Sequence, residues 1–215
     1  TTVDVTGLTA STDYIIQIFE YNGEGVSDGT VYLTSTSTNN PNTQASYTPI
    51  TIYVNSSTGD DSTGVGSSGS PYQSFHKAYT EYVDGDVFDM TGTFDWDNGT
   101  GESGDVSGYG YRIYKDITII GHGASSTIFQ PNSTIESSNK RIFTVYDGYS
   151  LVINSSTVRY GDPNSTGWNG GCLYGSAGSD VTINNSEVHS CKIYGGYGFG
   201  MNMLGNLTIT NSAIY

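Results

Sequence analysis

Three segments in the last third of the chain share one pattern of apolar and polar positions. They read LVINSSTV (151–158), VTINNSEV (181–188) and LTITNSAI (207–214), with apolar residues at the first, third and eighth positions of each. The first and third positions lie on the same side of a strand. The Ser or Asn at the fifth position, followed by Ser, tolerates bent backbone. The pattern therefore predicts a strand, a corner, and a second strand that returns to the core on the next face.

The spacing of these segments predicts a solenoid. They start at residues 151, 181 and 207, which is 30 and then 26 residues apart. A repeating unit of this length winds one coil, and strands of neighbouring coils lie about 4.8 Å apart. The residues expected to stack are Ile153, Ile183 and Ile209 inside the coils, and Ser155, Asn185 and Asn211 at the corners.

Other segments fit the same coils. A degenerate fourth copy, ITII, occupies 117–120, and short apolar runs precede the three repeats at 142–145, 172–174 and 201–203. A single coil cannot bury its own apolar face, so the coils depend on one another for stability. We therefore expect an all-β chain dominated by a parallel solenoid over residues 51–215.

The N-terminal region has a different pattern. Strand-like runs at 14–19 and 31–34 flank the turn sequence NGEG at 22–25, which predicts an antiparallel hairpin. The preceding segment, LTASTDY (8–14), resembles the tyrosine corner of fibronectin type III domains. The resemblance implies that the Tyr14 hydroxyl bonds back to the chain near Leu8. Any other β-sandwich hairpin is the alternative interpretation.

That resemblance covers only the last three of seven strands. We therefore expect residues 1–38 to be the C-terminal part of a fibronectin type III-like domain that is cut at its start. Residues 39–50 are polar and hold two prolines, which is typical of a linker.

Residues 52–94 resemble the opening of extracellular right-handed β-helix proteins of the pectate-lyase-like superfamily. A Tyr-Val strand, a Gly/Asp/Ser loop and a Pro-aromatic step lead into a short amphipathic segment at 72–82. Its apolar face would hold Phe75, Ala78, Tyr79 and Tyr82. The resemblance implies a helix that covers the first coil, because an uncovered solenoid end is a sticky edge.

The segment GGCLYGSAGSDVTI (170–183) further resembles the GG-containing repeats of polymorphic outer-membrane-type surface proteins. The Phe-x-x-Asn element of those repeats is missing here. Together these resemblances imply a right-handed parallel β-helix with an N-terminal capping helix, preceded by a partial fibronectin type III-like β-sandwich. They imply a fold and no particular activity, because this fold hosts many functions.

The net charge, the hydropathy and the cysteine content indicate which partners are disfavoured and which cysteine states are open. The net charge is −14 with seven Lys and Arg residues, which disfavours nucleic acids and anionic membrane surfaces as partners. No apolar run approaches the roughly 18 residues that a membrane span needs. The chain has two cysteines, Cys172 and Cys191, and either one disulfide or two buried thiols fits the sequence.

Polysaccharide lyases and hydrolases share this fold, so the acidic residues of the chain are candidate catalytic groups. Asp147 and Asp180 fall in corresponding turns of successive repeats, whereas the acids at 84–97 lie outside the aligned repeats. Solvated turn carboxylates are the favoured interpretation. His122, in a Gly-His-Gly sequence similar to one glycosidase family of this fold, is interpreted as structural because no partner motif accompanies it.

The loop DWDNGTGESGD (95–105) is a candidate calcium site. Carboxylates and carbonyl oxygens are calcium ligands, which makes Asp95, Asp97 and Glu102 the candidates. Gly99 stands where an EF-hand loop has a third acid, so a flexible acidic loop is the default interpretation. No other cofactor is expected.

Asparagine and tyrosine suggest contacts with glycans. The candidate N-glycosylation sites are Asn55, Asn98, Asn132, Asn154, Asn164, Asn184 and Asn206. The 18 tyrosines either stack on bound glycans or, as is commoner in sheets, pack across neighbouring strands.

We therefore expect a non-enzymatic, extracellular or cell-surface structural or adhesive module, a segment of a larger stalk or fibre protein. The alternatives are a polysaccharide lyase or glycoside hydrolase of the β-helix superfamily and a glycan-binding module. Leu207, Ile209 and Ile214 should form an apolar cross-section at the last coil. Further coils of the same chain, or other subunits docked end to end, are the expected partners, together with extracellular glycans.

Overall fold

The computed structural model describes residues 48–96, 102, 108–131, 140–163, 169–193, 197–198 and 200–215, together with the backbone of 21–22 and 31–32. The chain divides into two compact units, Thr1–Thr48 and Pro49–Tyr215. In the first unit, β1 (Tyr21–Asn22) pairs antiparallel with β2 (Val31–Tyr32). This pairing agrees with a hairpin, but Tyr14 and the run at 14–19 lie outside the described residues. The fibronectin-like corner therefore stays a prediction.

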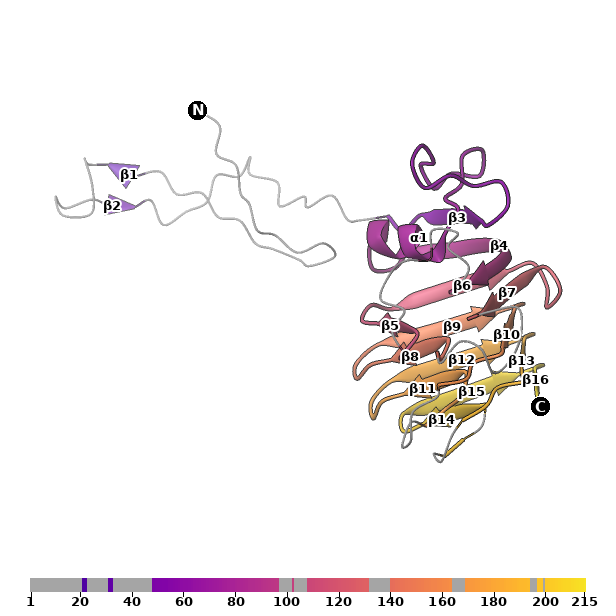
Figure 1. The fold of residues 1–215 in the computed structure, drawn as a ribbon. Helices are drawn as coiled ribbons and strands as arrows, with labels where there is room; N and C mark the ends of the chain where they lie inside the picture. Colours follow the sequence, from indigo (N-terminus) through magenta and orange to yellow (C-terminus); the bar gives the residue numbers. More distant parts are fainter. Residues whose placement is uncertain are drawn as a thin grey trace. The chain divides into compact units, whose positions relative to one another are not determined.

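The second unit is a parallel β-solenoid of about three turns (Figure 1). Face 1 is the sheet β5-β8-β11-β14, whose strands are Tyr111–Ile113, Phe143–Val145, Leu173–Gly175 and Met201–Met203. Face 2 is β3-β4-β6-β9-β12-β15, with strands Thr51–Asn55, Val87–Asp95, Ile117–Gly121, Ser150–Asn154, Asp180–Asn184 and Asn206–Thr210. Face 3 joins the end of β4 to β7-β10-β13-β16, which span Thr127–Gln130, Thr157–Arg159, Glu187–His189 and Ala213–Ile214.

One long strand turns the corner between two faces in the first coil. The first half of β4 pairs with β6 on face 2, and its second half pairs with β7 on face 3. Gly92 lies between the halves with φ +113°, a left-handed conformation that favours glycine. A Cβ there would lie 2.1 Å from the Ser56 hydroxyl oxygen, so only glycine fits this bend.

The predicted stacking is confirmed. Ile183 pairs in register with Ile153 on one side and with Ile209 on the other. The degenerate copy also belongs to this stack, because Ile119 pairs with Ile153. Alternation along each strand buries the first and third positions of the repeat, as the apolar pattern requires.

The corner residues also take the predicted role. Ser155, Asn185 and Asn211 have φ values of 52°, 48° and 48°, the left-handed conformation that Asn tolerates best among non-glycine residues. The serine that follows each of them forms a ladder between coils. The Ser156 amide donates to the Ser186 hydroxyl at 3.1 Å, and the Ser186 amide donates to the Ser212 hydroxyl at 3.1 Å. This ladder satisfies backbone donors that the bent corner leaves without strand partners.

The capping helix is shorter than predicted. Helix α1 spans Phe75–Glu81 rather than 72–82, because the Ser74 hydroxyl accepts the Lys77 amide and caps the helix there. The residues just before Ser74 are not helical, and Tyr72 among them forms a parallel β-bridge to Val54. The predicted apolar face is right, since Phe75, Ala78 and Tyr82 are buried and Tyr79 packs against the same core.

Beneath α1 the core is aromatic. Phe75 packs against Trp96, Tyr111 and Phe143 with ring centroids 5.9, 4.5 and 5.7 Å away. Toward the far end of the stack the core becomes aliphatic, with Leu151 and Ile153 on β9 and Val181 on the neighbouring strand β12. The helix and this cluster therefore close the first coil.

The two cysteines form a disulfide. Cys172 lies just before β11, at the start of a coil, and Cys191 lies just after β13, near the end of the same coil. The sequence left this bridge and two free thiols as equal alternatives. The bond ties the ends of one coil together across the side where face 3 leads back to face 1.

Candidate functional site

The outer side of face 1 is polar and aromatic. Phe143 and Val145 of β8 point into the core, and so do Leu173 and Gly175 of β11. The residues between them, Thr144 and Tyr174, are paired in register on the opposite side. The same row continues to Arg112 and Asn202 on the neighbouring strands.

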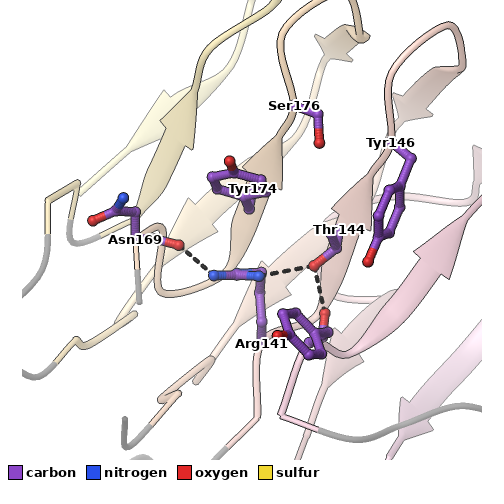
Figure 2. Close-up of a pocket in the computed structure, with 7 residues that line it drawn as sticks. Arg141, Thr144, Tyr146, Asn169, Tyr174 and Ser176 are labelled. Atoms are coloured by element: carbon purple, nitrogen blue, oxygen red, sulfur yellow. Dashed lines mark hydrogen bonds between the residues drawn. The ribbon is translucent and has the colours of Figure 1, made fainter. Parts of the chain in front are cut away.

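A pocket of about 400 Å³ opens on this side of the sheet (Figure 2). We call it the tyrosine pocket. Its lining consists of three tyrosines, one arginine and three small polar residues: Tyr109, Tyr146, Tyr174, Arg141, Thr144, Asn169 and Ser176. These residues lie on or beside the face 1 strands of three successive coils, β5, β8 and β11, so the pocket exists only when the coils are stacked.

Arg141 is the fixed centre of the pocket. Its Nε donates to the Gly170 carbonyl at 2.8 Å, its Nη1 to the Thr144 hydroxyl at 2.8 Å, and its Nη2 to the Asn169 carbonyl. Figure 2 shows the guanidinium lying between Thr144 and Asn169. The Tyr174 ring centroid lies 5.0 Å from Cζ, a cation–π distance.

Arg141 remains positively charged although its side chain is buried. The side chain is only 3 % exposed, and this burial lowers the pKa of Arg141 to about 10. The guanidinium is therefore still protonated at pH 7. Thr144 in turn donates to the Tyr109 carbonyl at 2.6 Å, so the arginine and both sides of the pocket form one connected network.

A strip of tyrosine rings continues from the pocket toward the turns that lead to face 2. Tyr146 stacks on Tyr114 with centroids 4.4 Å apart, and Tyr149 meets the Tyr114 ring edge-on at 6.4 Å. Burial raises the pKa of Tyr146 to about 12, so its hydroxyl is protonated at neutral pH. Tyr109 and Tyr114 are 42 % and 43 % exposed, which leaves aromatic surface open to a ligand.

Aromatic rings beside fixed polar groups are the kinds of side chain that contact saccharides. Aromatic rings offer apolar faces for the C–H surfaces of a sugar, and fixed polar groups orient its hydroxyls. Glycoside hydrolysis needs two carboxylates flanking the scissile bond. Among the described lining residues there is no Asp or Glu.

The two turn carboxylates singled out in the sequence occupy different positions. Asp180 pairs in register with Ser150 and accepts a hydrogen bond from Asn206 at 2.7 Å. Asp147 lies three residues before Ser150, next to Gly178, where an added Cβ would come within 2.1 Å of its carboxylate. Asp147 and Asp180 therefore lie in corresponding turns but at different positions within those turns.

His122 has a partner that the sequence did not reveal. Its Nε2 lies 2.7 Å from the Asp89 carboxylate, which comes from the preceding coil. The His122 ring is half exposed, and its backbone amide donates to the Thr127 hydroxyl at 3.0 Å. Asp86, one of the other acids in this region, instead accepts the amides of Ile50 and Val83 and fixes the turn before β4.

The calcium candidates have other hydrogen-bond partners. The buried Glu102 carboxylate accepts the amides of Phe75 and His76, at 2.7 and 3.1 Å, and the Tyr111 hydroxyl at 2.8 Å. Asp95 is buried and accepts from the Gln130 amide nitrogen at 3.2 Å. Asp97 lies outside the described residues. Within the described ranges, no three potential ligands gather in a metal-binding group.

Two predicted glycosylation sites take part in a ladder between coils. The Asn184 amide nitrogen donates to the Asn154 side-chain oxygen at 3.0 Å, and the Asn154 amide nitrogen donates to the Ile119 carbonyl at 3.2 Å. Asn55 accepts the amides of Ser57 and Thr58 in a tight turn. Asn98, Asn132 and Asn164 lie outside the described residues, and glycosylation at every site stays a prediction.

No protein-family model, curated protein or solved structure matches this chain significantly. The parallel β-helix therefore rests on the chain's own repeats and strand pairing. The fibronectin-like and surface-protein resemblances stay predictions from sequence motifs.

Proposed function

We propose that this chain is a non-enzymatic, extracellular structural and adhesive module, a segment of a larger cell-surface stalk or fibre protein. The observation that carries the proposal is the in-register stacking of Ile119, Ile153, Ile183 and Ile209 on successive coils. A stack of this kind lengthens by adding coils without any change in its cross-section. Length at constant width is the property that a stalk or fibre needs.

Neighbouring coils have matching apolar cross-sections. Leu207, Ile209 and Ile214 pair in register with Val181, Ile183 and Val188 of the preceding coil. Successive coils therefore stack through equivalent apolar positions, which is the geometry that a long solenoid requires.

The disulfide supports an extracellular location. Disulfides persist in oxidising compartments, and the bond between Cys172 and Cys191 ties the ends of one coil together. The net charge of −14 keeps such a surface apart from nucleic acids and anionic lipids. The described residues include no helix with the length and hydropathy of a membrane span.

Glycan binding at the tyrosine pocket is the second candidate function, and it would supply the adhesive contact. The support is the conjunction of the fixed Arg141 guanidinium with the rings of Tyr109, Tyr146 and Tyr174. Cleavage of a polysaccharide is less well supported, because the described lining provides no carboxylate pair.

One experiment separates binding from cleavage. The purified chain is incubated with polygalacturonate, xylan and β-glucan; electrophoretic retardation measures binding, and reducing ends or unsaturated uronates measure cleavage. We expect retardation by a neutral polysaccharide, weakened in Tyr174→Ala, with no product released. Thr182→Ala, on the outer side of face 2, is the matched control. Product that disappears in Asp147→Asn or Asp89→Asn would overturn the non-enzymatic proposal.

A further inference from the structure

A second polar depression lies on a different side of the solenoid, along the outer side of face 3. It measures about 560 Å³. Three titratable residues line it: Arg159 at the end of β10, and Glu187 and His189 on β13. Ile128 and Thr157 line it beside them. We call it the face 3 depression; it shares no residue with the tyrosine pocket.

Arg159 is held in place while its terminal nitrogens stay available. Its Nε donates to the Gln130 side-chain oxygen at 2.9 Å, and its Cζ lies 4.7 Å from the Tyr160 ring centroid. No described residue accepts a hydrogen bond from its Nη atoms. A guanidinium fixed through Nε and an aromatic face presents its remaining N–H groups in a defined fork.

His189 stands beside Arg159, because the two residues are paired in register on adjacent strands. Its ring stacks on Tyr215 at 5.1 Å and meets Tyr160 edge-on at 6.2 Å, and its Nδ1 lies 2.9 Å from the Ser190 hydroxyl. Burial and the nearby Arg159 charge lower the pKa of His189. A neutral imidazole both donates and accepts hydrogen bonds.

Glu187 completes the set. It pairs in register with Thr157, two positions from Arg159 along β10, and accepts the Tyr215 hydroxyl at 3.3 Å. Within the described ranges, Glu187 and Arg159 do not form an ion pair, although both line the depression. A cationic donor and an anionic acceptor therefore face a common ligand without neutralising one another.

We propose that the face 3 depression binds a neutral saccharide unit through adjacent hydroxyl groups. A hydroxyl accepts from a guanidinium and donates to a carboxylate, so two neighbouring hydroxyls satisfy Arg159 and Glu187 together. An anionic ligand would meet the Glu187 carboxylate and a chain of net charge −14. This site is independent of the tyrosine pocket, and it gives the module a second binding face.

The test is residue-resolved titration of the 215-residue chain with three neutral probes, cellohexaose, xylohexaose and mannohexaose, and with hexagalacturonate. We expect at least one neutral probe to shift the amide NMR signals of β10 and β13. Arg159→Ala and Glu187→Gln should each weaken that binding by about tenfold or more, the loss of one charged hydrogen-bonding group. Hexagalacturonate should bind no more tightly than the neutral probes.

Two control variants separate this site from the others. Tyr174→Ala should leave the face 3 shifts unchanged, and so should Thr182→Ala on face 2; thermal unfolding checks that every variant is folded. The proposal is overturned if no neutral probe shifts β10 or β13, or if both Arg159→Ala and Glu187→Gln bind as the wild type does. It is also overturned if only hexagalacturonate binds there. Shifts confined to face 1 would support the tyrosine pocket and refute this site.

Discussion

Individual residues account for both the successes and the failures of the sequence-based prediction. The corner positions of Asn185 and Asn211 were predictable from sequence, because a corner depends on residues adjacent in the chain and recurs in each repeat. Glu102 was interpreted as a loop acid because the groups that engage it, on α1 and β5, are distant in the chain. The pair of His122 and Asp89 was missed for the same reason.

Glu102 gives a pH-dependent prediction. Burial raises its pKa from 4.5 to about 7, although the hydrogen bonds from Phe75, His76 and Tyr111 oppose this shift. Between pH 4.5 and about 7, Glu102 is therefore protonated in a larger fraction of the folded protein than of the unfolded protein. Its contribution to stability is therefore fully present below about pH 4.5 and is lost as the pH rises through about 7.

The Glu102→Gln variant isolates that contribution, because Gln has nearly the same shape and does not titrate. We expect the free energy of unfolding of the wild type to fall relative to Glu102→Gln by up to about 3 kcal/mol between pH 4.5 and 8. Urea unfolding of both proteins across this range measures the difference. A constant difference would show that the donors balance burial, and a wild type that gains stability with rising pH would show that they outweigh it; either result contradicts the prediction.

At the scale of elements, strand positions were predictable and loop-borne contacts were not. The three repeats specify which residues point inward, and the observed register follows them. The tyrosine pocket draws Tyr109, Arg141 and Asn169 from segments outside the aligned repeats. Those segments differ in length and sequence from coil to coil. The repeat pattern therefore could not predict that their residues line a pocket. The start of α1 was misplaced because Tyr72 continues the apolar spacing but bridges to Val54.

Adjacent residues of β12 test the strand register. Ile183 is fully buried between Ile153 and Ile209, whereas Thr182 lies on the outer side of the same strand. Ile183→Asp buries a charge and should destabilise the fold by about 4 kcal/mol or more. Thr182→Asp should cost about 1 kcal/mol or less. Thermal unfolding compares the two; equal losses, or the larger loss at Thr182, would indicate a register shifted by one residue.

For the whole molecule, the class of fold was accessible from sequence because a solenoid repeats its local rules. Each coil contacts only its neighbours, so a pattern of 26 to 30 residues contains most of the structural information. The first unit offered no such repetition, and its fibronectin-like assignment rests on a single motif around Tyr14. The fold does not specify the function, because the same kind of coil occurs in enzymes and in fibres.

The central claim, that stacked coils build an elongated structural object, is tested most directly by electron microscopy of the native protein isolated from its source. The account predicts rods or fibres of constant width. Oriented specimens should show an axial spacing of about 4.8 Å, the separation of hydrogen-bonded strands in neighbouring coils. Compact, monomeric particles with the mass of one 215-residue chain, stable in isolation, would contradict it.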